Sequence, residues 1–497
     1  MDFLANLVDK INGYITDYCL VFLLIGVGLY FTIRTKFVQV RCFGEGMRNV
    51  FGKLSLKGGK QKGGLSSFQA LATAIAAQVG TGNIVGACGA ILIGGPGAIF
   101  WMWLIAFLGM ATIYAEAVLA QKTRETDENG EIHGGPVYYI RTFFKGGFGK
   151  FLAGFFAVAT MLALGFMGTM VQSNSIAGTA GAAMGMSENY YWIIGLVVAA
   201  LAAVVFLGGI NRLASVTEKL VPVMALLYIV GSLVVIFARI QYIPETFGMI
   251  FKYAFNANAL IGGGIGVALK AAISQGAKRG LFSNEAGMGS TPHAHAQANV
   301  KTPHEQGVTA MIGVFIDTFI VLTMTALVVI STLYAGNGVL GDVGSYSAAN
   351  GGLLENISKE FPKANLAQMA FGVVFGETFG NIFVAVCLFF FAFSTILSWN
   401  FFGKINFQYL FGKKYTVIYT VLAIGFVFLG SIFQNDFVWN LTDFFNNLMV
   451  IPNVIALVCL GSLVAKSAKT RGACDLPEIP GNAAAEPEEV AKEKVSE

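Results

Sequence analysis

Long apolar stretches separated by short polar segments recur along most of the chain. A bilayer core about 30 Å thick is crossed by about 20 apolar residues in a helix. By that measure the sequence contains eleven candidate spans, near residues 16–33, 68–92, 97–120, 150–180, 190–208, 217–238, 258–298, 308–334, 368–399, 415–433 and 441–464. The pattern predicts an all-α membrane protein with about eleven transmembrane helices.

The amino-acid composition agrees with this prediction and excludes several functions. Of the 497 residues, 55% are hydrophobic and 12% are charged, whereas a typical soluble domain carries about 25% charged residues. A soluble enzyme of this length is therefore excluded. The six cysteines are scattered without a CxxC pair, and the four histidines form no HExxH motif. This pattern argues against a thiolate metal site and a disulfide framework, and no organic cofactor is expected.

Basic residues concentrate in alternate loops. The segment from Arg34 to Lys62 holds eight Lys and Arg residues and a single acid, Glu45. Because basic loops stay on the cytoplasmic side, we expect a multi-pass protein of the cell membrane with its N-terminus outside and its C-terminus in the cytoplasm. The expected organisation is an extra span with a basic loop (1–67), two five-helix repeats (68–238 and 239–465) and a disordered tail (466–497).

Two spans contain glycine-rich interruptions. The second span carries GTGNIVG at 80–86, and the seventh carries GLFSNEAGMGS at 280–290, followed by Pro292. Each Gly weakens a helix by about 1 kcal/mol relative to Ala, and Pro292 suits the first turn of a new half-helix with Ser290 or Thr291 as its N-cap. The pattern predicts two broken helices, with close packing through small residues as the alternative. Such interruptions in corresponding halves indicate a transporter site, and five spans per half predict an inverted repeat.

Several motifs resemble those of the alanine/glycine:cation symporter family. They are GTGNIVGACGAILIGGPGAIFWMW (80–103), NEAGMGSTPHAHA (284–296), FSTILSWNFFG (393–403), GGPVYYI (134–140) and VQSNSIAGT (171–179). The resemblance extends from about residue 15 to 465. It implies a leucine-transporter-like fold of five-plus-five inverted repeats with two broken helices. It also implies sodium- or proton-coupled uptake of alanine or glycine.

A zwitterionic amino acid needs donors for its carboxylate and acceptors for its ammonium group. Free N–H groups at a half-helix can bind the carboxylate, and carbonyls near Phe282 and Ser283 can accept from the ammonium. Gly165, Gly168 and Gln172 are spaced to share one helix face that suits a small ligand, although Gln172 could instead bond a neighbouring helix. The predicted substrate-binding residues are Gly80, Thr81, Gly82, Asn83, Gly165, Gly168, Gln172, Phe282, Ser283 and Trp399.

The ninth span carries three hydroxyl groups, from Ser394, Thr395 and Ser398, on one helix face. Sodium prefers hard oxygen ligands, and neutral ones suffice where carbonyls are free. The family resemblance implies a sodium ion between the hydroxyls of Ser394 and Thr395 and the carbonyls of Ala76 and Val79. The alternative is that these hydroxyls bond the carbonyls of their own helix.

Among the acids that fall inside predicted spans, where an unpaired charge is costly, three are candidates for a functional role. Asp317 is predicted to serve a second ion or a proton. Glu116, near the cytoplasmic end of the third span, is a functional candidate, with a position at the interface as the alternative. Glu285 is predicted to pair with Lys278 or Arg279, or to cap the second half-helix, with contact to the substrate as the alternative.

The sequence therefore favours a secondary symporter, not an enzyme, in which sodium entry drives uptake of a small neutral amino acid. Proton coupling, or selectivity for glutamine or serine on the same fold, remains an alternative. An ion channel would show a repeated selectivity loop or rings of like charge, and an enzyme would show paired acids, a metal cluster or a nucleophile with its base. The expected partners are the amino acid, sodium or a proton, and the bilayer, without nucleic acid, and the chain is expected to be a monomer.

Overall fold

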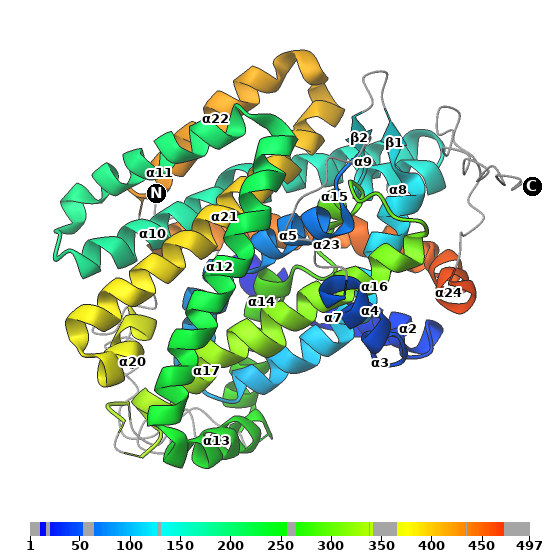
Figure 1. Cartoon of the computed structure of the whole chain (residues 1–497). Helices are drawn as coiled ribbons and strands as arrows, with labels where there is room; N and C mark the ends of the chain where they lie inside the picture. Colours follow the sequence, from blue (N-terminus) through cyan, green and yellow to red (C-terminus); the bar gives the residue numbers. More distant parts are fainter. Residues whose placement is uncertain are drawn as a thin grey trace, which may run out of the picture.

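A computed structural model describes residues 10–15, 20–52, 64–126, 131–255, 265–336, 338–340, 365–433 and 435–471. Within these ranges the chain is almost entirely helical (Figure 1). A two-stranded antiparallel sheet pairs β1 (Glu125–Thr126) with β2 (Ile132–His133). The prediction of an all-helical architecture is confirmed.

The helices follow one another in the order of the apolar stretches. Those labelled η are π-helical (η2, η3, η7, η8) or 3-10 (η4, η5, η9). The N-terminal part contains α2 (Val21–Arg34), α3 (Val38–Arg41) and α4 (Phe43–Phe51). The next part contains α5 (Ser67–Gln78), η2 (Gly82–Gly86), α6 (Ala87–Gly94), α7 (Ala98–Thr123), α8 (Pro136–Phe143), α9 (Gly146–Thr160), η3 (Met161–Gly168), α10 (Thr169–Ala183), η4 (Glu188–Tyr190), α11 (Tyr191–Phe206) and α12 (Gly209–Ala238). The last part contains η5 (Ile240–Tyr242), α13 (Ile243–Phe255), α14 (Ile265–Asn284), α15 (Pro292–His295), α16 (Pro303–Val314), η7 (Phe315–Leu322), α17 (Thr323–Val329), η8 (Ile330–Tyr334), α20 (Leu366–Phe375), α21 (Glu377–Phe411), η9 (Lys413–Tyr415), α22 (Thr416–Gly430), α23 (Asn435–Cys459) and α24 (Gly461–Thr470).

Eight helical segments in the described ranges are long and apolar enough to cross a membrane, and the bent pair α5–α6 raises the number to nine. The predicted first span corresponds to α2, which has 14 residues, and the predicted seventh span contains α14. The count of eleven spans and the inverted repeat therefore stay predictions. The eight segments are Ala98–Thr123, Gly146–Ala183, Glu188–Phe206, Gly209–Ala238, Pro303–Tyr334, Glu377–Phe411, Lys413–Gly430 and Val438–Cys459.

The long helix of the predicted span 368–399 lies further along the chain than expected. Helix α20 ends at Phe375, and Gly376 then adopts a φ of 81°. Because glycine reaches positive φ without steric cost, the chain turns here and starts α21. The membrane-length helix is therefore α21, with 35 residues.

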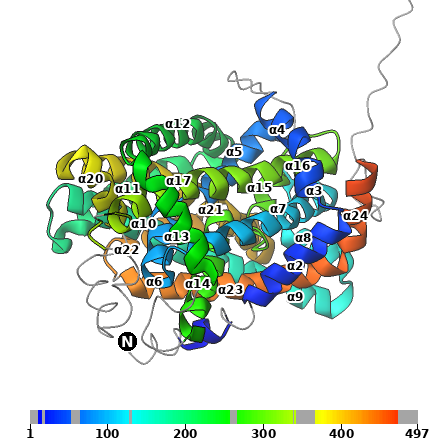
Figure 2. The same cartoon turned by 90° about the horizontal axis from the view of Figure 1, so that it is seen from below.

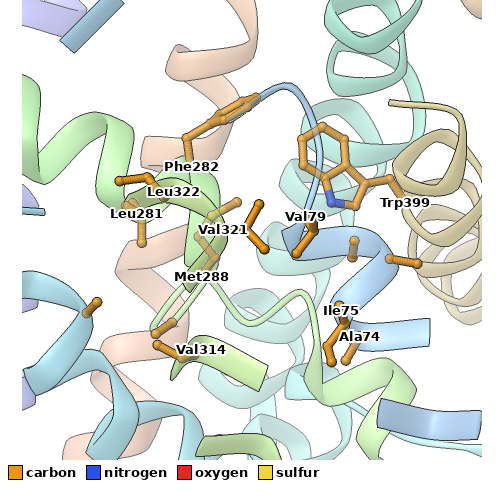
Figure 3. Packing of buried hydrophobic residues seen from close by; sticks show 14 of the residues in the cluster. Ala74, Ile75, Val79, Leu281, Phe282, Met288, Val314, Val321, Leu322 and Trp399 are labelled. Carbon is orange, nitrogen blue, oxygen red and sulfur yellow. The ribbon is translucent and has the colours of Figure 1, made fainter. Parts of the chain in front are cut away.

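The two predicted breaks lie near the centre of the molecule, among α5, α7, α14, α16 and α21 (Figure 1). Helix α7 packs against α14 and α16, and α21 packs against α5 and α10. Buried apolar side chains such as Leu281, Val314 and Val321 fill the space between the broken helices (Figure 3). This packing fixes the backbone on which the polar residues of the breaks are carried.

The N- and C-terminal elements lie together along one side of the protein. Both views place α2, α3, α4 and α24 there (Figures 1 and 2). Helix α24 continues to Thr470, past the predicted start of the tail at residue 466. Residues 472–497, and residues 53–63 of the basic loop, lie outside the described residues.

The division into two repeats stays a prediction, with its boundary at the end of α12.

Candidate functional site

The first break separates α5 from α6. Val79 leaves the helical conformation with a ψ of 87°, and the two helices are bent by 45°. The N–H of Gly80 donates to Oδ1 of Asn83 at 3.0 Å. The N–H of Thr81 donates to Oε1 of Gln172, on α10, at 3.2 Å. Side chains thus replace helical partners at this point, as a broken helix requires.

Glycine at positions 80 and 82 allows the first break to approach its neighbours closely. A Cβ atom on Gly80 would clash with the hydroxyl of Thr395 on α21. A Cβ on Gly82 would lie 3.0 Å from the Cα of Ser283, at the end of α14. The first break therefore contacts both α21 and the second broken helix.

The second break is the longer of the two and joins α14 to α15. Glu285, Gly287 and Gly289 have positive φ values of 57°, 92° and 81°. Pro292 occupies the first turn of α15, as predicted. Thr291 stands at the N-cap position, but its side chain makes no capping hydrogen bond. Helix α15 is only four residues long, so the half-helix is shorter than the apolar pattern indicates.

Glu116 of α7 holds the second break in place. It is fully buried, and its carboxylate accepts hydrogen bonds from the N–H groups of Gly287 at 3.1 Å and Gly289 at 2.9 Å. It also accepts from Nδ2 of Asn453, on α23, at 2.6 Å, and Tyr139 donates to the other atom of that amide, Oδ1. The interfacial alternative for Glu116 is wrong, because the side chain is fully buried, and its carboxylate supplies acceptors for backbone N–H groups that the break has freed.

Glu285 has neither of the predicted partners. Lys278 and Arg279 form ion pairs with Asp443, on α23, at 2.6 and 3.4 Å. Among the described residues, Glu285 instead accepts hydrogen bonds from the indole N–H of Trp399 at 2.5 Å and from the hydroxyl of Ser290. The left-handed backbone at Glu285 ends α14 and removes this side chain from the helix face of the two basic residues. The predicted pairing is therefore wrong.

Asp317 connects the two breaks. It lies in the π-helical segment η7 and is fully buried. Its carboxylate accepts from Nδ2 of Asn83 at 2.6 Å and from the hydroxyl of Ser283 at 2.9 and 3.1 Å. The hydroxyl of Thr318 donates to it at 2.8 Å. In the part of the chain that the structure describes, no basic side chain pairs with Asp317, and this oxygen-rich group suits a hard cation.

The predicted sodium ligands lie at the contact between α21 and the end of α5. The hydroxyl of Thr395 donates to the carbonyl of Ala76 at 2.9 Å, and that of Ser394 lies 3.4 Å from the same oxygen. Both hydroxyls are also within hydrogen-bond distance of the Phe391 carbonyl, at 3.1 and 2.8 Å. The predicted sodium ligation and the alternative of hydrogen bonds within α21 therefore use the same two hydroxyl groups. Val79 is buried beside them, and no described hydrogen bond joins its carbonyl to either hydroxyl.

Aromatic rings border the region of the breaks (Figure 3). The rings of Phe282 and Trp399 meet edge to face with their centroids 5.6 Å apart. A Cβ on Gly168 would lie 2.5 Å from the Trp399 ring, whereas one on Gly165 would lie 2.6 Å from the hydroxyl of Tyr419. The two glycines thus contact different neighbours. Because η3 is π-helical, with i→i+5 hydrogen bonds, a spacing of three does not keep them on one face.

Several buried polar atoms around the first break lack a hydrogen-bond partner among the described residues, and three of them belong to the break itself or to α10 and α21 beside it. They are Oγ1 of Thr81, Nε2 of Gln172 and Oγ of Ser398. Buried polar atoms are almost always hydrogen-bonded. These atoms are therefore available to a ligand, and two of them belong to predicted substrate-binding residues.

Comparison with known proteins identifies the family. Residues 1–472 match the model of the sodium:alanine symporter family. The chain belongs to the sodium:alanine symporter family. Together with its apolar helices, this membership shows a multi-pass membrane transporter.

Curated relatives of this symporter family match over nearly their whole length. An uncharacterised transporter of Haemophilus influenzae is 39% identical, over 94% of this chain and 96% of that protein. The sodium/alanine symporter AgcS of Methanococcus maripaludis is 39% identical, over 94% of this chain and 97% of that protein. The probable sodium/glutamine symporter GlnT of Bacillus subtilis is 34% identical, over 94% of this chain and 90% of that protein.

Within this family member, the structure joins most of the predicted site residues through direct contacts. Sequence reasoning missed the roles of Glu116 and Asn453, whose only signal was an acid and an amide inside apolar spans. Gly165 stands apart from the breaks, against Tyr419. The contacting pairs are Gly80 with Thr395, Thr81 with Gln172, Gly82 with Ser283, Asn83 with Asp317, and Phe282 and Gly168 with Trp399.

Proposed function

We propose that this protein is a secondary symporter that couples inward sodium flow to uptake of a small neutral amino acid, alanine or glycine. The observation that carries the proposal is the position of Asp317. Its carboxylate bonds Asn83 of the first broken helix and Ser283 of the second. A cation bound there contacts both breaks, so its binding is linked to the helices that move in alternating access.

The polar atoms of the first break support a site for the substrate carboxylate. In the proposed complex the carboxylate replaces Oε1 of Gln172 as the acceptor for the N–H of Thr81. Nε2 of Gln172 and Oγ1 of Thr81, which have no other described partner, then donate to it. Backbone donors bind an anion without adding a buried full charge. The ammonium group binds the carbonyls of Phe282 and Ser283, and Trp399 borders the side chain.

Two ion positions follow from the oxygen atoms present. The first lies between the carbonyls of Ala76 and Val79 and the hydroxyls of Ser394 and Thr395, all neutral ligands that sodium accepts. The second is at Asp317. There the hydroxyl of Ser283 turns its lone pairs toward the cation once the cation replaces its hydrogen bond.

Proton coupling is the second candidate for the driving ion, because the carboxylate of Asp317 can carry a proton as readily as it ligates sodium. Glutamine is the second candidate substrate, favoured by the 34% identity to GlnT. The contact of Gly168 with the Trp399 ring favours the smaller substrates. We further propose a monomer in the cytoplasmic membrane with its N-terminus outside and its C-terminus inside.

The decisive experiment is uptake of radiolabelled alanine into proteoliposomes that contain the purified protein. We expect uptake with an inward sodium gradient, inhibition by glycine, graded inhibition by serine, and weak inhibition by leucine and glutamine. Uptake driven by a proton gradient without sodium would mean that the coupled ion is a proton and not sodium. Competition by glutamine equal to that by alanine would overturn the proposed substrate.

A further inference from the structure

Three side chains of types that can ligate a metal ion lie together where α4 meets the start of α16. Both helices are on the side of the protein that carries the terminal elements (Figure 2). Cys42 immediately precedes α4, Glu45 lies in its first turn, and His304 lies in the first turn of α16. One ligand atom of each lies within 4.8 Å of the other two. We propose that Cys42, Glu45 and His304 form a binding site for a divalent transition-metal ion with the preferences of zinc.

The backbone around this cluster is closely packed. A Cβ atom on Gly46 of α4 would lie 2.6 Å from the carbonyl of Val308 on α16. Cys42 and His304 are both about fully buried, each with 1% of its surface exposed. The cluster is therefore a built feature of the contact between two helices and not a chance meeting of mobile surface side chains.

His304 is oriented for metal binding. Its Nδ1 atom lies 2.7 Å from the hydroxyl of Tyr114, on α7. Its Nε2 atom is buried and faces the carboxylate of Glu45, with 3.3 Å to Oε1. The tautomer whose Nδ1–H donates to Tyr114 leaves the Nε2 lone pair directed into the cluster. Metal-binding histidines are oriented in this way by an outer hydrogen bond.

The ligand types select the metal. Sulfur, imidazole nitrogen and carboxylate oxygen together suit zinc, whereas magnesium and calcium take oxygen ligands. On binding, the thiol of Cys42 releases its proton to solvent, and the thiolate forms the sulfur–metal bond. Glu45 keeps 33% of its side chain exposed, so an ion and a water molecule as fourth ligand can reach the site.

Arg471, at the end of α24, competes with a metal for the same carboxylate. Its Nη1 atom lies 3.4 Å from Oε2 of Glu45, while Oε1 faces His304. Removing this charge should therefore strengthen metal binding, whereas it should weaken a simple ion-pair network. The thiol of Cys42 also distinguishes a metal site from an ion-pair network, because an ion pair between His304 and Glu45 does not need sulfur.

The test is a titration of the full-length protein in detergent with Co²⁺, followed by displacement with Zn²⁺. Cobalt bound to a thiolate in tetrahedral geometry gives a near-ultraviolet charge-transfer band and visible bands. We expect one equivalent to bind with both features. Cys42→Ser should abolish the charge-transfer band, and Tyr114→Phe should lower the affinity by about 10- to 100-fold. Arg471→Gln should raise the affinity.

Cys459, an exposed thiol on α23, provides the matched control, and Cys459→Ser should keep the full spectrum. The proposal is overturned if wild-type protein shows no thiolate band, or if the band survives Cys42→Ser. Should Cys42→Ser fail to fold, Glu45→Gln decides the question, since an affinity equal to that of the wild type rejects the site. The experiment measures the absorption spectrum of bound cobalt and not amino-acid uptake. A negative result therefore rejects the metal site without bearing on the proposed symport.

Discussion

The two helix breaks are stabilised in different ways. In the first, the backbone N–H groups bond nearby amide side chains, those of Asn83 and Gln172, and several polar atoms beside them have no partner in the described chain. In the second, two backbone N–H groups bond the buried carboxylate of Glu116. A neutral amide oxygen is exchanged for a ligand more easily than a buried carboxylate, whose hydrogen bonds are roughly twice as strong.

This difference separates the roles of the two breaks. The first presents groups that a substrate can satisfy, and the second presents a loop that α7 holds in one conformation. Asp317 contacts Asn83 and Ser283 and so links the exchangeable break to the fixed one. Four substitutions test this comparison, in order of decreasing expected effect.

Glu116→Ala should have the largest effect on stability. It leaves the N–H groups of Gly287 and Gly289 without their acceptor, whereas Nδ2 of Asn453 keeps its hydrogen bond to the Gly287 carbonyl. Each buried unsatisfied group costs about 1–3 kcal/mol, so the free energy of unfolding should fall by about 3 kcal/mol or more. The measurement is the thermal unfolding temperature of the purified protein in detergent.

The control for this variant is Glu377→Ala, which removes an exposed acid at the start of α21. It should change the free energy of unfolding by about 0.5 kcal/mol or less. Glu116→Gln should fall between the two, because it keeps one acceptor oxygen. An unfolding temperature of Glu116→Ala equal to that of the wild type would mean that the second break does not depend on α7.

Asp317→Asn should disrupt the link between the breaks. The substitution keeps the shape but removes the charge, and hydrogen bonds to charged groups contribute about 1.5–3 kcal/mol. The cation concentration for half-maximal alanine uptake should rise by about 10- to 100-fold. Asp443→Asn is the control, because this acid pairs with Lys278 and Arg279 outside the breaks. It should leave the cation dependence unchanged. If Asp317→Asn also leaves the cation dependence unchanged, Asp317 does not take part in ion coupling.

Gly168→Ala should alter substrate size selection. The added Cβ would lie 2.5 Å from the ring of Trp399, which must shift. One added carbon in a tight site discriminates by about tenfold or more, so uptake of alanine should fall by that factor relative to glycine. Competition assays with labelled alanine measure the ratio. Gly178→Ala, on α10, has nothing within 4 Å of its Cβ and should leave the ratio unchanged. An equal loss of alanine and glycine uptake would argue against a role of Gly168 and Trp399 in substrate size selection.

Thr395→Ala should have the smallest effect, confined to the sodium dependence. As a proposed ligand the hydroxyl contributes one neutral contact to sodium, worth about 1 kcal/mol, so the sodium concentration for half-maximal uptake should rise about fivefold. Thr395→Ser should restore the wild-type value. Thr332→Ala is the control, because within the described ranges its hydroxyl donates to the carbonyls of Val328 and Val329, in the turn before it. An unchanged sodium dependence in both Ser394→Ala and Thr395→Ala would remove these hydroxyls from the ion site.

The helix breaks could be predicted from sequence because their causes are local. Gly80, Gly82 and Pro292 are visible in the sequence itself, as glycines that weaken a helix and a proline that suits a first helical turn. The partners of the buried acids could not be predicted in this way. Glu116 bonds residues 171 and 173 positions away, and Asp317 bonds Asn83 across 234 positions. Nothing in a single sequence specifies contacts at such separations.

The sequence by itself determined the membrane class, the helical architecture, the family and the positions of the two breaks. These depend on apolar run length, glycine placement and contiguous motifs, all of which act within a few residues along the chain. Only the tertiary structure decided that Glu116 secures the second break, that Glu285 binds Trp399 while Asp443 takes Lys278 and Arg279, and that Gly165 contacts Tyr419. The physical reason is that a buried polar group bonds whichever partner helix packing brings within about 3 Å, and that packing joins segments far apart in the sequence.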